Sequence, residues 1–274
     1  MTKRVIEMPE LGMGTLRLEG DTAYNSVKMA LEVGFRHIDT AQIYGNEAEV
    51  GQAIVDSDIS RDELFITTKV WFEAFSEDKF IDSVKDSLTK LKTDYVDLLL
   101  IHWPSPKDEV DMAVYLSELK KSKEMGFARE IGISNFTIAQ TQQTLDILGE
   151  GEIFTNQIEV HPYLQNDKLV GFCQANKITV TGYMPFAYGK VLADETLKVI
   201  AEKHQISTAQ LVIQWLAQRD IVTIPSSTKR HNLASNFKET GIRLSDDEMT
   251  KIAGLDCNDR QANPDFAPEW DASR

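Results

Sequence analysis

Short apolar runs alternate with longer amphipathic stretches along this chain. The runs are typical of buried strands, and they predict strands at residues 11–15, 36–39, 64–69, 96–101, 130–134, 154–157, 179–183 and 221–224. Apolar side chains at helical spacing predict helices in stretches such as 22–33, 80–91, 110–125, 164–176 and 209–217. Because strands that alternate with helices usually pair in parallel beneath those helices, the pattern indicates an α/β fold.

Polar side chains follow most of the predicted strands, and this placement decides between two α/β architectures. Polar chemistry at the carboxyl ends of strands, all round the sequence, is typical of a barrel. A doubly wound domain would instead begin with a glycine-rich fingerprint, and Gly12 and Gly14 lack the third glycine. The sequence therefore predicts a (β/α)8 TIM barrel. It forms a single domain over residues 1–274, with 256–274 as a C-terminal tail near the pocket.

Composition and charge limit the partners of the chain. With 29 Lys and Arg against 43 Asp and Glu, the net charge is −14, which argues against nucleic-acid and membrane partners. The sequence has no apolar run of about 18 residues and no signal-peptide core at its start. Cys173 and Cys257 lack ligand spacing, so no metal site is expected. A soluble, cytoplasmic protein that acts on a small molecule is predicted.

Four polar residues near the strand ends form a candidate catalytic set, although each alone is also typical of a structural position. A lysine such as Lys69 at the inner end of a barrel strand loses hydration, so it needs an anion or its pKa falls. Asp39 is the candidate for that anion. A tyrosine hydroxyl such as that of Tyr44 would become more acidic beside this pair, which suits proton donation. His102 is placed to donate a hydrogen bond to a substrate oxygen.

The segments around these residues resemble the aldo-keto reductase family across nearly the full chain. The resemblance rests on His37–Ala41, Tyr44–Glu47, Thr68–Trp71, Leu100–Pro104, Ile131–Phe136 and Asn156–Glu159. It implies a monomeric barrel that binds NADPH across the carboxyl-end face. Tyr44 would donate the proton, Lys69 paired with Asp39 would lower the pKa of Tyr44, and His102 would orient the carbonyl.

The same resemblance implies a set of cofactor contacts. The nicotinamide carboxamide would bind Ser134, Asn135 and Gln157, with Tyr183 stacked on the ring and the segment holding Met184 and Phe186 along the diphosphate. Asn135 is also a candidate helix N-cap, and Gln157 a candidate buried hydrogen-bonding residue of the barrel. Contacts at the adenosine end would come from Ser226, Ser227, Thr228, Lys229, Arg230 and Asn236.

The adenosine end departs from the family pattern. Ser226 stands where many relatives carry a lysine, and Asn232 stands where they carry an arginine. Lys229 and Arg230 would then supply the positive charge that favours NADPH, at the start of the following helix. A solvated helix start is the alternative interpretation of the segment 228–230.

The substrate is expected to be a small polar carbonyl compound held by His102, Trp71 and Trp103, with Phe266 or Trp270 closing the pocket. The short stretch after Pro104 indicates an open pocket, suited to 2,5-diketo-D-gluconate and to aldehydes like methylglyoxal. Two alternatives remain at this point. A barrel aldolase would use Lys69 as a Schiff-base nucleophile, and a non-catalytic module would bind NADPH as a redox sensor.

Overall fold

The computed structural model describes residues 7–273, and within them one sheet of eight parallel strands follows chain order. The strands are β1 (Met13–Gly14), β2 (His37–Asp39), β3 (Phe65–Val70), β4 (Val96–Ile101), β5 (Ala128–Ser134), β6 (Ile153–Glu159), β7 (Thr179–Tyr183) and β8 (Ile221–Thr223). Each strand pairs with the next one along the chain, so the predicted strands and their alternation with helices are confirmed.

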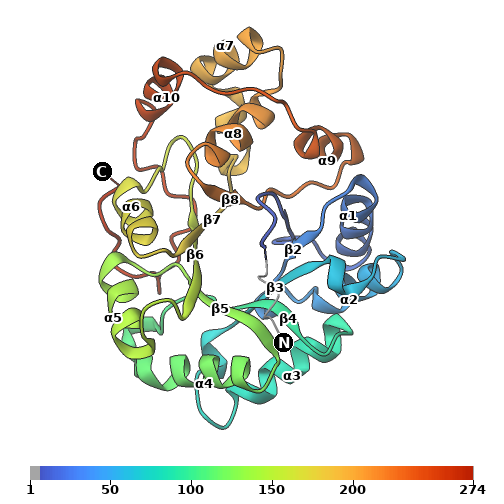
Figure 1. Ribbon diagram of the computed structural model, residues 1–274, viewed down its shortest axis with the longest axis vertical. Coiled ribbons are helices and arrows are strands. Elements are labelled where there is room, and N and C mark those ends of the chain that lie inside the picture. Colours follow the sequence, from blue (N-terminus) through green and yellow to red (C-terminus); the bar gives the residue numbers. More distant parts are fainter. Residues whose placement is uncertain (1–6, 274) are drawn as a thin grey trace.

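The helices lie outside the curved sheet, which is the arrangement of a (β/α)8 fold (Figure 1). They are α1 (Gly20–Val33), α2 (Glu47–Val55), α3 (Phe80–Leu91), α4 (Met112–Glu124), α5 (Ile138–Leu148), α6 (Asp167–Ala175), α7 (Glu195–Lys203), α8 (Thr208–Ala217), α9 (Arg230–Phe237) and α10 (Asp246–Ala253). Helices in this described part of the chain are too short or too polar to cross a membrane.

The first and last strands approach each other through the segment that precedes β1. Leu11 forms a parallel bridge with Thr223 in β8. The N–H of Gly12 donates to the carbonyl of Thr223 at 2.9 Å, and the N–H of Thr223 donates to the carbonyl of Glu10 at 2.9 Å. These bonds bring the carboxyl ends of β1 and β8 to the same side of the molecule.

Two helices begin later than their apolar pattern predicts, and each delay has a local cause. The carboxylate of Asp111 accepts the N–H of Ala113 at 2.9 Å, so this cap starts α4 at Met112. Residues 161 and 164 bond to each other through their backbones before α6. Asn166 then takes a left-handed φ of 49°, which no helical residue has, so α6 begins at Asp167.

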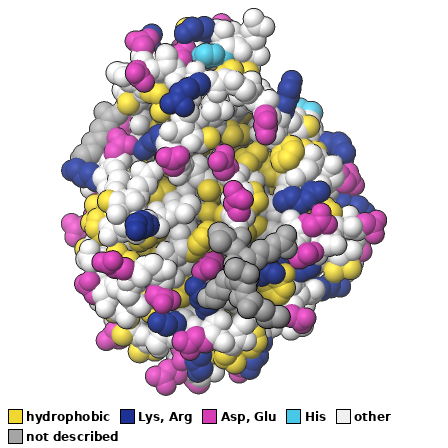
Figure 2. Space-filling model, in the orientation of Figure 1, with side chains coloured by type: hydrophobic (Ala, Val, Ile, Leu, Met, Phe, Trp, Pro, Cys, Tyr) yellow, Lys and Arg dark blue, Asp and Glu magenta, His cyan; other side chains and the backbone are white. Residues whose placement is uncertain are grey.

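Apolar side chains fill both faces of the sheet away from its carboxyl end. A large cluster lies between strands and helices, and a smaller one contains Met8, Phe65, Leu98, Leu100 and Val222. Phe65 and Lys69 lie on the same face of β3, because side chains alternate along a strand. Buried polar residues such as His37 and Asp97 lie near the amino ends of strands, whereas the candidate catalytic residues lie at the carboxyl ends. On the face shown in Figure 2, acidic and basic side chains are intermingled, so the excess acidic charge does not gather there in one area.

Candidate active site

Asp39, Lys69 and Tyr44 meet at the carboxyl ends of β2 and β3. Asp39 ends β2, Tyr44 lies in the short turn after it, and Lys69 is the penultimate residue of β3. The Lys69 ammonium is fully buried and donates to Oδ1 of Asp39 at 2.5 Å and to the carbonyl of Thr40 at 2.8 Å. Nζ of Lys69 also lies 5.1 Å from the ring centroid of Tyr44. The charge of the lysine is thus neutralised by one carboxylate and directed toward one phenol.

Protonation at this cluster follows from burial and from the ion pair. Burial alone would lower the pKa of Lys69, but Asp39 and Tyr44 raise it above its ordinary value. Lys69 therefore stays charged at neutral pH, which leaves no free amine for a Schiff base. Burial raises the pKa of Tyr44 above its ordinary value, while Lys69 acts to lower it. The expected net acidification of Tyr44 is thus wrong for this structure, because burial outweighs the lysine, and the hydroxyl keeps its proton.

His102 lies directly after β4 and faces the same cluster. Its ring packs edge-on to Tyr44, with 5.5 Å between centroids, and edge-on to Trp71, with 5.3 Å. Burial, followed by the charge of Lys69, holds the pKa of His102 well below its ordinary value. The imidazole is therefore neutral near pH 7, with one N–H available as a donor.

A group of amide and hydroxyl side chains adjoins the ion pair at the ends of β5, β6 and β7. Nε2 of Gln157 donates to Oδ2 of Asp39 at 2.7 Å, so the buried barrel hydrogen bond considered for Gln157 is present. Asn135 donates through Nδ2 to the carbonyl of His102 at 3.0 Å and to Oγ of Ser134 at 3.1 Å. Its Oδ1 accepts the hydroxyl of Tyr183 at 2.7 Å.

Asn135 owes its orientation to its backbone. Its φ of 64° lies in the left-handed region, where asparagine is among the better tolerated residues. Thr137 caps α5 instead, because its hydroxyl accepts the N–H of Gln140 at 3.3 Å. The N-cap role considered for Asn135 is therefore wrong, and its side chain stays with the polar group at the strand ends.

A cavity of about 850 Å³ opens over these residues. Among its lining residues are the predicted ones Tyr44, His102, Trp71, Trp103, Ser134, Asn135, Gln157, Tyr183, Met184, Phe186, Ser226, Ser227 and Asn236. Asp39 lines it too, whereas Lys69 lies behind, fully buried. The cavity therefore joins the ion pair at one end to the loop after β8 at the other.

The cationic residues expected at the far end lie outside the lining of this cavity. Arg230 begins α9 and pairs with Glu32 of α1, so its charge is directed to that carboxylate. Lys229 is exposed, and its N–H donates to Oγ of Ser227 at 3.2 Å. Sequence reasoning assigned no role to Arg17, which lines the cavity and lies 4.2 Å from the ring centroid of Tyr188. Arg17 is the third residue after β1, and this nearness to a strand end is the signal that the sequence contains.

Aromatic side chains from the C-terminal residues pack against the tryptophans of the cavity. The ring of Phe266 lies edge-on to Trp71 at 5.7 Å and to Trp103 at 5.4 Å between centroids. Trp270 contacts Trp103 at 5.9 Å. Trp71 and Trp103 both line the cavity, so these contacts form the outer layer of its wall.

Comparison with known proteins gives consistent matches over nearly the whole chain. The model of the Aldo/keto reductase family matches residues 10–256. Methylglyoxal reductase DkgB of Escherichia coli O157:H7 is 52% identical over 265 residues, covering 96% of this chain and 99% of that protein. Glyoxal reductase of Bacillus subtilis (strain 168) is 39% identical, covering 95% and 94%. A crystal structure assigned as a 2,5-diketo-D-gluconic acid reductase B has a TM-score of 0.93 and 42% identity, covering 97% and 94%.

Proposed function

The chain belongs to the aldo/keto reductase family, and we propose that it reduces small aldehydes and ketones with NADPH as the hydride donor. The observation that carries the proposal is the set of Asp39, Lys69, Tyr44 and His102, grouped at one end of a cavity lined by neutral amides. We also propose that the bonds between the first and last strands close the sheet into a barrel, which holds these strand ends on one face.

The polar groups of the cavity suit a nicotinamide cofactor. An amide ligand needs both donors and acceptors, and Ser134, Asn135 and Gln157 offer both kinds. Within residues 7–273 the side-chain oxygen of Gln157 accepts no hydrogen bond from another residue, so it is available to an amide N–H. The ring of Tyr183 supplies an aromatic face beside them. When bound, NADPH supplies the hydride that the carbonyl carbon accepts.

The residues of the cluster then have separate tasks. The hydroxyl of Tyr44 gives its proton to the carbonyl oxygen as the hydride reaches the carbon, so an alcohol forms. Lys69, held charged by Asp39, stabilises the phenolate that remains. Neutral His102 donates a hydrogen bond to the same oxygen and orients the carbonyl. A charged Lys69 also argues against the alternative Schiff-base aldolase.

The proposed substrates are small polar carbonyl compounds. Trp71 and Trp103, backed by Phe266, narrow the cavity around His102. Relatives are methylglyoxal and glyoxal reductases, and a structural neighbour is assigned as a 2,5-diketo-D-gluconic acid reductase. We therefore propose methylglyoxal-like aldehydes, and reduction of 2,5-diketo-D-gluconate to 2-keto-L-gulonate, as the reactions to test.

The test is NADPH oxidation in the presence of these two carbonyl compounds. Tyr44→Phe should lower kcat/KM by about 10²- to 10⁴-fold, the contribution of a positioned acid. Tyr24→Phe is the matched control, since its hydroxyl bonds to Asp56 at the surface of α1 and it should keep full activity. Full activity in Tyr44→Phe would contradict the mechanism. A wild-type protein that binds NADPH without turnover would favour the redox sensor.

A further inference from the structure

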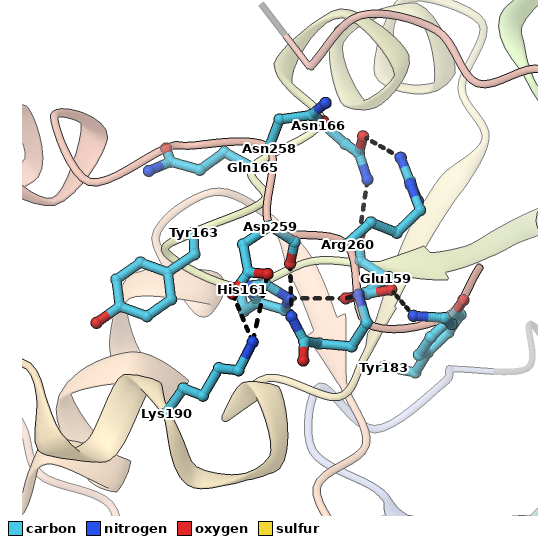
Figure 3. Close-up of polar contacts among 12 residues, drawn as sticks. Glu159, His161, Tyr163, Gln165, Asn166, Tyr183, Lys190, Asn258, Asp259 and Arg260 are labelled. Carbon is cyan, nitrogen blue, oxygen red and sulfur yellow. Dashed lines mark hydrogen bonds and ion pairs between the residues drawn. The ribbon is translucent and has the colours of Figure 1, made fainter.

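Glu159, the last residue of β6, holds the C-terminal segment from inside the protein. Its side chain is fully buried. Oε1 accepts the N–H of Gln261 at 2.7 Å and Nε2 of His161 at 2.8 Å, and Oε2 accepts the N–H of Ala262 at 2.8 Å. Figure 3 shows this carboxylate between the strand end and the tail. One buried charge thus binds two consecutive backbone amides about 100 residues away in sequence.

Further bonds fix the same stretch of tail to the loop after β6. The carbonyl of Glu159 accepts Nδ2 of Asn166 at 2.7 Å, and Oδ1 of Asn166 accepts the guanidinium of Arg260 at 3.2 Å (Figure 3). That guanidinium lies 3.8 Å from the ring centroid of Trp270. Lys190, in the loop after β7, pairs with Asp259 at 2.9 Å, but the lysine is largely exposed and the aspartate partly exposed. The buried carboxylate is therefore a stronger attachment than this exposed pair, since exposed pairs contribute little.

The anchored stretch continues directly into the wall of the cavity. Ala262 lines the cavity itself. Four residues later, Phe266 lies edge-on to Trp71 and Trp103, and Trp71 lies edge-on to His102. A short chain of contacts thus leads from Glu159 to the residue that orients the carbonyl.

We propose that Glu159 is a positioning residue for substrate selection. It fixes residues 261 and 262, so that Phe266 holds Trp71 and Trp103 in the cavity wall and small carbonyl compounds are preferred over bulky ones. This inference rests on the proposed reductase function, because the selected molecule is its substrate. Glu159 touches neither the carbonyl nor the cluster of Asp39 and Lys69, so its effect should fall on KM and on substrate size rather than on kcat.

Glu159→Gln tests the bonds of the carboxylate to residues 261 and 262 while keeping the packing around the side chain. Glutamine keeps the shape of the side chain but presents an NH2 group where one carboxylate oxygen stood, and that group faces a backbone N–H or His161. One amide then loses its acceptor, and the other loses a charged one. Glu118→Gln is the matched control, because Glu118 is also a buried acidic residue, on α4, and pairs with Lys121, away from the tail.

The experiment combines hydrogen exchange with a comparison of substrates. In the wild type, the amides of Gln261 and Ala262 should exchange slowly, and Glu159→Gln should speed them about tenfold or more. The kcat/KM ratio of methylglyoxal to an aromatic aldehyde should fall about tenfold through the KM of methylglyoxal, with kcat kept. Glu118→Gln should change neither readout.

A second variant tests the contacts of Phe266 separately from the bonds of Glu159 to residues 261 and 262. Phe266→Ala should produce the same shift in substrate ratio while residues 261 and 262 stay protected, and Glu159→Gln should add nothing to it, because both act through one ring. Unprotected amides in the wild type, additive effects, or equal loss of kcat for both aldehydes would overturn the proposal. A wild type that reduces neither aldehyde would instead contradict the reductase function. Its exchange rates would still show whether Glu159 holds residues 261 and 262.

Discussion

Replacing Asp39 by asparagine should expose how strongly the ion pair constrains the active site. The substitution keeps the size of the side chain and removes one charge. In the wild type, the carboxylate accepts Lys69 at 2.5 Å and Gln157 at 2.7 Å through different oxygens. Asparagine offers one acceptor, so its NH2 group faces one of these two donors. The ammonium of Lys69, which is fully buried, keeps the carbonyl of Thr40 as its other partner.

The expected loss of stability in Asp39→Asn comes from the buried charge of Lys69, which no longer has a carboxylate partner. Removing one partner of a buried pair costs about 3–5 kcal/mol of the free energy of unfolding. The cost should depend on pH, because Lys69 without Asp39 has a pKa below that of the unfolded chain. The unfolded state then binds more protons, so the variant gains stability as pH rises toward about 10. In the wild type Asp39 raises the pKa of Lys69, so no such gain occurs in that range.

Urea unfolding of both proteins at about pH 7 and pH 9.5 measures this difference. We expect a deficit of about 3–5 kcal/mol at neutral pH that narrows at the higher pH. Asp82→Asn, which removes an exposed carboxylate paired with Lys85 on α3, should show no measurable change. A deficit below about 1 kcal/mol, or one that stays constant with pH, would refute the reasoning.

Three further outcomes follow from the charges in the structure. Burial lowers the pKa of His37 to about 4, below its value in the unfolded chain. Lowering the pH from about 7.5 to 4.5 should therefore reduce the free energy of unfolding by about 2.5 kcal/mol more in the wild type than in His37→Gln. Urea unfolding measures this difference, and equal reductions in the two proteins would contradict the prediction. Because the pKa of His102 is far below 6.5 and that of Tyr44 is raised, kcat/KM for reduction should be flat from about pH 6 to 9, and an ionisation in that range would count against the assigned roles. Lys229→Ala should lower the kcat/KM preference for NADPH over NADH by about tenfold, and Arg230→Ala by less, because Glu32 already pairs with that arginine; the reverse order would show that the pair opens for the cofactor.

The strand ends could be predicted from sequence because the fold brings them together whatever the intervening loops do. Asp39, Lys69, His102 and Gln157 lie far apart in the chain, but each closes an apolar run. In a parallel sheet with strands in chain order, all carboxyl ends face one side, so such residues become neighbours without any knowledge of loop geometry. The family motifs then supplied the roles that position alone leaves open.

Exposed charges were less predictable, because a cation is directed by whichever anion lies nearest in space. Arg230 looked available in the sequence, yet its partner Glu32 is 198 residues away on α1. The net effect on Tyr44 was missed for a related reason. The sequence shows that a lysine is near, but the extent of burial, which outweighs that lysine, depends on the packing of the whole site.

The C-terminal segment shows where sequence patterns stop being informative. As far as Ser273, where the described residues end, it contains neither helix nor strand after α10, so no periodicity indicates which side it presents. Its position comes from bonds that join irregular backbone to distant side chains, such as the N–H of Ile138 to Asp271 at 2.7 Å and the amides of 261 and 262 to Glu159. Backbone amides donate irrespective of side chain, so residue identity carries no signal of these contacts. What the sequence does contain is the acceptor of these bonds, Glu159, an acidic residue that ends a buried strand and does not belong to the candidate catalytic set. A carboxylate in that position requires donors, and a tail returning across the strand ends is the part of the chain best placed to provide them.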